Sequence, residues 1–168
     1  MKRLLFVVLM LTATCASAGN LEDGNAAIEK KDYVTALIKF KLSAAQGNAP
    51  AQYNLGLMYA NGYGVTQDYV EAVRWFKLSA AQGNATAQYS LGVMYDNGDG
   101  VTQDYVEARR WYKLSAAQGN ATAQYNLGGM YKNGYGVTQD YVEAVRWFKL
   151  SAAQGNATAQ YNLGVMYK

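Results

Sequence analysis

Apolar residues recur at helical spacing in two alternating kinds of segment. In the first kind, four side chains share one face of a helix: Ala51, Leu55, Met58 and Tyr59. Asn48 precedes this segment and suits a helix N-cap, because its side-chain oxygen can accept a hydrogen bond from a free backbone N–H group. Pro50 fits a first helical turn, and Gly62 accepts the left-handed conformation that ends many helices. The pattern predicts a helix, here named helix A, that ends at Asn61.

The second kind of segment opens with Asp68. Together, Asp68 and Glu71 resemble a capping box, in which the Asp oxygen accepts a hydrogen bond from a backbone N–H group and the Glu side chain reaches back. Five side chains then share one face: Tyr69, Ala72, Trp75, Phe76 and Ser79. Gly83 follows the last of these apolar positions. This pattern predicts a second helix, here named helix B.

Side-chain size predicts how the two helices of a pair pack. By their phase, Tyr59, Trp75 and Phe76 point into the core. Gly56 and Ala72 are small, so the two helix backbones can approach closely where the large aromatic side chains fill the remaining space. We therefore expect each pair to form a tight helical hairpin.

The pair of segments repeats every 36 residues. Tyr69, Tyr105 and Tyr141 mark the period, and three successive units are identical at 30 of 36 positions. The predicted divisions are an N-terminal segment 1–18, a diverged repeat 19–50, full repeats 51–86, 87–122 and 123–158, and a half repeat 159–168. Tandem helical hairpins bury their apolar faces only against neighbouring hairpins. The predicted fold is therefore all-α, an α/α-solenoid.

The repeat carries a recognisable set of residues: Ala51-Gln52-Tyr53-x-Leu55-Gly56-x-Met58-Tyr59, Gly62-x-Gly64-Val65, Asp68-Tyr69, Ala72, Trp75-Phe76 and Gln82-Gly83. From about Asp32 to Lys168 the chain resembles the Sel-1-like repeat family, a longer variant of the tetratricopeptide repeat. The first repeat departs from the pattern because it lacks the Gly-x-Gly turn, and Leu78 stands where many members carry a basic residue. The resemblance implies a protein-interaction scaffold whose A helices line a concave groove.

Two of the six positions that vary between repeats, 57/93/129 and 60/96/132, fall on the face of helix A that the resemblance assigns to the groove. We expect ten residues of this face to contact a protein or peptide partner: Tyr53, Leu57, Ala60, Tyr89, Val93, Asp96, Tyr125, Gly129, Lys132 and Tyr161. Asp96 and Lys132, in adjacent repeats, carry opposite charges that can orient a ligand. Partial burial between neighbouring A helices is an alternative role for the tyrosines, and drift is an alternative origin of the variation.

Composition narrows the possible chemistry. The chain has 168 residues, a net charge of +3, no His and one Cys. Ser-His-Asp and Cys-His catalysis and the usual zinc sites are therefore excluded, and we expect no catalytic residue, metal or cofactor. The segment Asp96–Gly100 faintly suggests a calcium loop, but Gly98 and Gly100 occupy ligand positions. The near-neutral charge provides no basic surface for nucleic acid.

An enzymatic function is the main alternative to a scaffold. Some cysteine-rich secreted members of the resembled family have been linked to β-lactam binding and hydrolysis. Those members carry a disulfide in every repeat, whereas this chain has a single cysteine and no Ser-x-x-Lys motif. A spacer, or a piece of a longer repeat array, is a third interpretation.

The final half repeat has an apolar face without a following helix B: Ala159, Leu163, Met166 and Tyr167. Exposed apolar surface often marks a contact site, so we expect self-association or a partner at this face. Fraying of the helix and continuation into a longer array are the alternatives.

The N-terminal segment has the pattern of an export signal. A positive start, Met1-Lys2-Arg3, precedes the apolar run Leu4–Leu11, which is too short to span a bilayer, and the small residues Ala16-Ser17-Ala18 follow. We expect cleavage after Ala18, a mature chain without a transmembrane span, and a periplasmic or secreted bacterial protein. Lipid attachment at Cys15 is the alternative.

The mature exported protein should begin at Gly19 and carry no acyl chain. Thr12 and Thr14 stand where a lipoprotein signal usually has Leu and Gly or Ala, which disfavours acylation of Cys15. Intact-mass measurement on exported protein checks this expectation. A mass that includes Cys15 and a lipid would contradict it.

Overall fold

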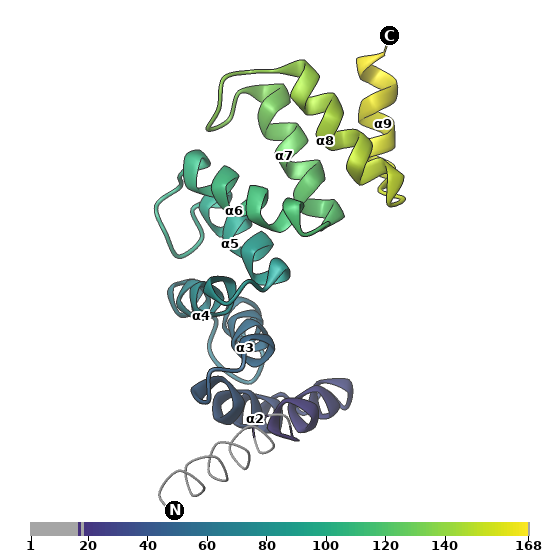
Figure 1. Ribbon diagram of the computed structural model, residues 1–168. Coiled ribbons are helices and arrows are strands. Elements are labelled where there is room, and N and C mark those ends of the chain that lie inside the picture. The colour runs from purple at the N-terminus through teal and green to yellow at the C-terminus, as the bar shows by residue number, and fades with distance from the viewer. Residues whose placement is uncertain (1–16, 18, 168) are drawn as a thin grey trace, which may run out of the picture. The chain divides into compact units, whose positions relative to one another are not determined.

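Helices joined by short turns make up the computed structural model, which describes residue 17 and residues 19–167 (Figure 1). The A helices are α3 (Ala49–Asn61), α5 (Ala85–Asn97), α7 (Ala121–Asn133) and α9 (Ala157–Met166). The B helices are α2 (Tyr33–Ala45), α4 (Tyr69–Ala81), α6 (Tyr105–Ala117) and α8 (Tyr141–Ala153). Helical residues 19–29 precede α2, and no strand occurs in the described ranges. The predicted all-α, α/α-solenoid fold is confirmed.

The chain divides into two compact units. Unit 1 is Met1–Gln82 and contains α2, α3 and α4; unit 2 is Gly83–Lys168 and contains α5 to α9. Within unit 2, each helix packs beside the next one in sequence, from α5 to α9 (Figure 1). The predicted export signal, apart from Ser17, lies outside the described residues, and so does Cys15.

The caps form largely as the sequence predicts. Asn48 accepts a hydrogen bond from the N–H of Ala51 at 3.0 Å, and Gly62 ends α3 with a φ of 70°. Asp68 likewise accepts hydrogen bonds from two backbone N–H groups at the start of α4. This agreement follows from short-range chemistry, because each cap needs only neighbouring residues.

The prediction that Glu71 completes a capping box is wrong. Glu71 does not reach back to the N–H of Asp68, because that N–H donates to the carbonyl oxygen of Tyr59 at 2.9 Å. Glu71 instead forms an ion pair with Arg74 one helical turn away, at 3.3 Å. A contact from helix A thus takes the donor that the box would have used.

A buried aromatic ring lies on a glycine in every helical pair. Phe76 of α4 is 1% exposed, and a Cβ added to Gly56 of α3 would lie 2.6 Å from its ring carbons. Three further pairs repeat the arrangement: Gly24 with Phe40, Gly92 with Tyr112 and Gly128 with Phe148. The prediction that a small residue allows close approach is confirmed, and the ring itself occupies the vacated space.

The other aromatic side chains lie farther from the core than their phase predicts. Tyr59 and Trp75 are half-buried and pack against the edge of the core in unit 1. Tyr69 is 39% exposed, so its assignment to the buried face is wrong. On the same helix Val73 is buried, although the sequence pattern leaves it off the apolar face.

Polar side chains join the end of helix B to the start of helix A in each full repeat. Three serines donate to a helix A carbonyl oxygen at 2.7 Å: Ser79 to Ala49, Ser115 to Ala85 and Ser151 to Ala121. Glutamines form a second set at 2.8 Å: Gln82 with Gln52, Gln118 with Gln88 and Gln154 with Gln124. These bonds satisfy polar groups that burial would otherwise leave unpaired, which would be costly.

Two adjacent glycines in α7 should respond oppositely to substitution by alanine. A Cβ at Gly128 would lie 2.8 Å from the Phe148 ring, whereas one at Gly129 would meet nothing within 4 Å. Gly128→Ala should lower the free energy of unfolding, because overpacking costs about 1–3 kcal/mol. Gly129→Ala should raise it by up to about 1 kcal/mol through helix propensity. Urea unfolding of both variants measures the difference. Equal effects would contradict this account of the glycine–ring contact.

Candidate functional site

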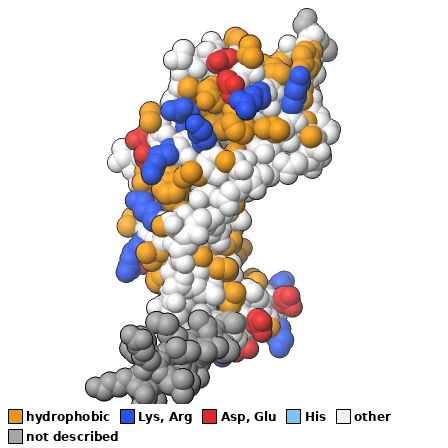
Figure 2. Space-filling view, viewed as in Figure 1, with side chains coloured by type: hydrophobic (Ala, Val, Ile, Leu, Met, Phe, Trp, Pro, Cys, Tyr) orange, Lys and Arg blue, Asp and Glu red, His pale blue; other side chains and the backbone are white. Residues whose placement is uncertain are grey.

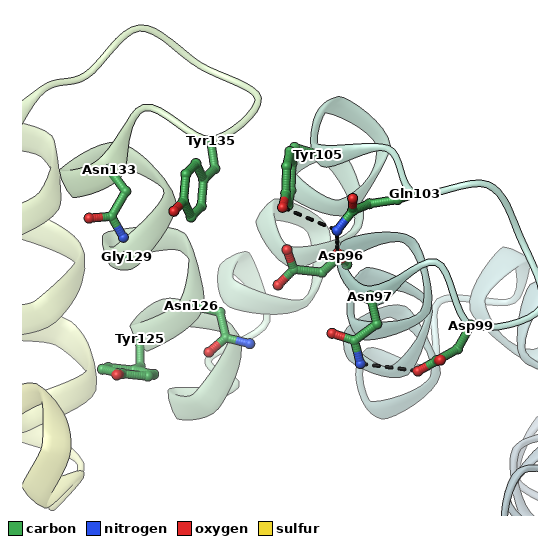
Figure 3. Close-up of a pocket in the computed structure, with 10 residues that line it drawn as sticks. All are labelled: Asp96, Asn97, Asp99, Gln103, Tyr105, Tyr125, Asn126, Gly129, Asn133 and Tyr135. Atoms are coloured by element: carbon green, nitrogen blue, oxygen red, sulfur yellow. Dashed lines mark hydrogen bonds between the residues drawn. The ribbon is translucent and has the colours of Figure 1, made fainter.

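A polar pocket of about 660 Å³ lies between α5 and α7 in unit 2 (Figure 3). Ten residues line this α5–α7 pocket: Asp96, Asn97, Asp99, Gln103, Tyr105, Tyr125, Asn126, Gly129, Asn133 and Tyr135. They come from the C-terminal half of α5, the turn after it, the start of α6, α7 and the turn after α7. The pocket therefore forms where the A helices of two successive repeats meet.

Asp96 is the acidic group nearest the middle of this arrangement. Its carboxylate points into the space between α5 and α7 (Figure 3), and Oδ2 accepts a hydrogen bond from the hydroxyl of Tyr112 at 3.1 Å. Burial raises the pKa of the Asp96 carboxyl above its ordinary value, and the Tyr112 hydrogen bond offsets part of that shift. Burial also raises the pKa of Tyr112, so this phenol stays a hydrogen-bond donor.

Gly129 opens the pocket on the side of α7. The equivalent positions in the preceding repeats hold Leu57 and Val93, which carry side chains into the same region. At Gly129, a Cβ would meet nothing within 4 Å, so the glycine serves no packing contact there. The missing side chain accounts for open space beside Asn126 and Tyr125.

Stacked tyrosines form one wall of the pocket. The rings of Tyr105 and Tyr135 lie 5.0 Å apart with an interplanar angle of 16°. Gly136 allows the contact, because it has a φ of 64° and lies so close to the carbonyl group of Tyr105 that no Cβ would fit. The Gly-x-Gly turn of one repeat is thereby held against the start of helix B of the repeat before it.

Gln103 fixes the turn that carries Asp99. Its side-chain amide donates to the backbone carbonyl oxygen of Asp96 at 2.6 Å and to the hydroxyl of Tyr105 at 3.1 Å. Asn97 donates to Asp99 at 3.1 Å, on the side of α5 that faces away from α7 (Figure 3). Asp96 therefore lies inside the pocket, and Asp99 lies at its rim.

Unit 1 contains a smaller pocket at the equivalent place, with a volume of about 210 Å³. Tyr33 and Tyr63 stack at 4.8 Å, as Tyr105 and Tyr135 do in unit 2. Ile28 and Leu57 line this pocket, with Asn54 and Asn61 beside them. Apolar side chains thus occupy the region that is polar and open in unit 2.

The sequence prediction located part of this site. Asp96, Tyr125 and Gly129 line the α5–α7 pocket, and Leu57 lines the equivalent pocket of unit 1. Four other predicted residues are half-buried on the A helices: Tyr53, Ala60, Tyr89 and Val93. Tyr53 and Tyr89 tilt against the rings of Phe76 and Tyr112 at 5.8 Å and 5.9 Å. Packing beside a core ring is thus a structural role for both tyrosines.

The remaining predicted residues lie outside the pocket. The ammonium group of Lys132 donates to Asn162 of α9 at 3.2 Å, and Tyr161 is 72% exposed. Asp96 thus accepts a hydrogen bond from Tyr112, and Lys132 donates one to Asn162, so each charged side chain has a partner within the chain.

Several pocket residues escaped the sequence prediction: Asn97, Asp99, Gln103, Tyr105, Asn126, Asn133 and Tyr135. Variation between repeats could have pointed to three of them, because two sets of equivalent positions differ: Asn54/Ser90/Asn126 and Tyr63/Asp99/Tyr135. The helical phase alone could not show that the turn after one A helix lies against helix B of the preceding repeat.

The family model for the Sel1 repeat matches residues 49–84, 85–120, 121–156 and 157–168. The chain belongs to the Sel1 repeat family. The Sel1 repeat model begins two residues before the repeats defined above, at the first residue of each A helix. A comparison with curated proteins gave no significant match.

Solved structures of Sel1 repeat proteins share the fold. One is c5321, described as a protective antigen of uropathogenic Escherichia coli with an SLR fold, at 42% identity and a TM-score of 0.89. The alignment covers 95% of this chain and 35% of that one. A Sel1 repeat protein from Oxalobacter formigenes matches at 33% identity and a TM-score of 0.82, over 86% of this chain and 59% of that one.

A more distant match shows the fold alone. It is Helicobacter pylori cysteine rich protein B, at 19% identity and a TM-score of 0.60, over 84% of this chain and 95% of that one. Within the part of this Sel1 repeat chain that the structure describes, no helix is long and apolar enough to cross a membrane. The same residues include no group of three or more His, Cys, Asp or Glu placed to hold a metal ion.

Replacing Asp96 should change how stability depends on pH. Burial raises the folded-state pKa of Asp96, so the folded state binds more protons than the unfolded state in the interval between the two pKa values. Wild-type stability should therefore fall relative to Asp96→Asn as the pH rises from below the ordinary pKa of an aspartate, about 4, through the raised pKa of Asp96. Tyr112→Phe should steepen the wild-type dependence, because it removes the hydrogen bond that holds the Asp96 pKa down. Urea unfolding at several pH values tests both. A difference between wild type and Asp96→Asn that stays constant with pH would contradict the assignment.

Proposed function

We propose that the chain is an exported bacterial scaffold that binds another protein through the A helices, with the α5–α7 pocket as its centre in unit 2. The observation that carries the proposal is this pocket, which is open at Gly129 and lined by tyrosines, asparagines and acidic side chains. Tyrosine and amide side chains suit peptide recognition, because they combine apolar area with hydrogen-bonding groups.

The rest of the repeat supports a scaffold role. Core and cap residues recur from repeat to repeat, whereas four of the six variable columns supply residues to a pocket: columns 54/90/126, 57/93/129, 60/96/132 and 63/99/135. A surface that changes on a constant framework is typical of repeat proteins that bind partners. The ten pocket residues include no Ser or Lys, so the site gives no support to a β-lactam-cleaving function.

Basic, acidic and hydrophobic side chains are intermingled on the face shown in Figure 2. A nucleic-acid-binding protein instead gathers Lys and Arg into a patch or stripe. The mixed surface is consistent with a protein partner.

A photo-crosslinking residue in the pocket should capture the partner. p-Benzoyl-phenylalanine placed at position 133, in place of the exposed Asn133 of the pocket lining, leaves the opening at Gly129 unchanged. Irradiation of the exported protein in envelope preparations should give a discrete protein adduct. The same residue at position 114, in place of the exposed Leu114 of α6, is the matched control and should give little or none. Equal adducts at both positions, or none at 133, would count against the proposed groove.

We further propose that the apolar face at α8 and α9 associates with a second copy of the chain. Four residues line a hollow of about 560 Å³ on this face: Tyr141, Val142, Val145 and Met166. Tyr141 is 56% exposed and Val142 is 79% exposed, although Tyr105 at the equivalent position of α6 is stacked on Tyr135. An apolar face of this kind is a candidate contact surface.

Light scattering on the mature protein tests the self-association. The wild type should have the mass of a dimer, and Val142→Glu should reduce it to a monomer by placing a charge in the apolar contact. Val106→Glu is the matched control, because Val106 occupies the same repeat position on α6 and is also exposed. It should leave the dimer intact. A monomeric wild type would exclude this contact.

A further inference from the structure

We propose that the α5–α7 pocket binds a cationic side chain of the partner, a lysine ammonium or an arginine guanidinium group. The inference rests on the proposed function, since it specifies the chemistry of the residue that the scaffold takes from its partner. Three features of the described residues carry it: the carboxylates, a wall of stacked tyrosines and a matched apolar pocket in unit 1.

The charge of the pocket is one-sided. Its ten lining residues include two carboxylates, Asp96 and Asp99, and no Lys or Arg. Asp96 is half-buried, and the ion pairs found among the described residues do not include it. A half-buried carboxylate without a cation bears a desolvation cost that an opposite charge offsets. A cationic ligand at Asp96 would supply that charge.

Aromatic rings line one wall of the same pocket. Tyr105 and Tyr135 form this stacked wall, whereas the ring of Tyr125 lies on the side of Asn126 away from Asp96 (Figure 3) and tilts against Phe148 at 5.8 Å. Tyrosine faces attract ammonium and guanidinium groups through the quadrupole of the ring. A carboxylate beside tyrosine rings thus favours a cation over a neutral polar group.

Hydrogen-bonding capacity points to the carboxylates. The side chains of Asn126 and Asn133 project from α7 with their amide nitrogens towards α5 (Figure 3), so the acceptors of the pocket are the oxygens of Asp96 and Asp99. Lysine and arginine offer several N–H donors and no acceptor, so carboxylate oxygens match them. The opening at Gly129 leaves room for the backbone that carries the side chain.

The pocket of unit 1 shares the stacked tyrosines and the asparagines, but it has neither the acid nor the opening. Gly24 contacts Phe40 as Gly92 contacts Tyr112, which aligns Ile28 with Asp96 four residues further along each helix. In unit 1 the acid is therefore an isoleucine, and the phenol that holds it is a phenylalanine. Leu57 stands in place of Gly129 and the volume is about 210 Å³.

Three changes thus occur together in unit 2: an acid, a hydroxyl donor to hold it, and the removal of a side chain opposite. Each change alone would be costly or without effect. An acid facing Phe instead of Tyr112 would lose its hydrogen bond, and an opening without Asp96 would have no selectivity for charge. Their combination specifies a site for a positively charged group.

The probe is Nα-acetyl-arginine N-methylamide, titrated into the full mature chain and followed by the NMR shifts of the backbone amides. Its neutral counterpart is Nα-acetyl-citrulline N-methylamide, which has nearly the same shape. We expect saturable shifts centred on Asn126 and Gly129, and an affinity at least tenfold higher for the arginine probe. Asp96→Asn should remove this preference. Glu29→Gln, which neutralises an exposed acid outside the pocket, should retain it.

A second variant keeps the test decisive if Asp96→Asn perturbs the fold. Gly129→Leu restores the residue of the first full repeat and should fill the pocket and abolish binding, while Leu57→Gly in unit 1 should leave binding unchanged. Equal affinity for the two probes, or binding that survives both Asp96→Asn and Gly129→Leu, overturns the proposal. A partner adduct at position 133 without arginine preference would leave the scaffold function standing and remove only this inference. Arginine-selective binding without any adduct would support the cation-binding pocket and count against the capture of a partner protein there.

Discussion

The contact between a glycine of helix A and an aromatic ring of helix B sets the geometry of every repeat. Phe76 lies directly on the backbone of α3 at Gly56, and the same contact recurs three more times along the chain. Any Cβ at the glycine would occupy the position of the ring, so the spacing of the two helices depends on the absence of one atom. Protein interiors are packed too densely to absorb such a collision without moving a neighbour. Ser79 and its equivalents, near the end of helix B, then donate hydrogen bonds to the carbonyl oxygen of the first residue of helix A.

The candidate site is built outward from this core contact. Tyr112 replaces phenylalanine in one repeat, and its ring keeps the position on the glycine of α5. The added hydroxyl therefore emerges at a fixed place, where it donates to Asp96 at 3.1 Å. A single oxygen atom on a core ring thereby positions a half-buried acid at the surface. The pocket depends on the core for its precision, as rigid elements generally provide for binding sites.

The repeat separates stability from recognition by position. Cap, glycine-contact and buried serine positions hold the same residue types in successive repeats, because each satisfies a requirement that every hairpin shares. Five of the ten residues that line the α5–α7 pocket instead lie in columns that vary between repeats: Asp96, Asp99, Asn126, Gly129 and Tyr135. Asp96 and Gly129 differ from their counterparts, and a pocket of distinct chemistry forms in unit 2 although its framework is that of unit 1.

The sequence by itself determined the helices, their ends and the way they pair. N-caps such as Asn48 and the left-handed Gly62 act within a few residues, and the 36-residue period shows that one hairpin is repeated. Only the tertiary structure decided what lies between hairpins. The period could not reveal that Tyr135 stacks on Tyr105 of the preceding repeat, that Glu71 is excluded from its capping role, or that Asp96 meets Tyr112. These contacts depend on the rotation and spacing of whole helices, and helical phase gives the direction of a side chain without giving the distance to its neighbour.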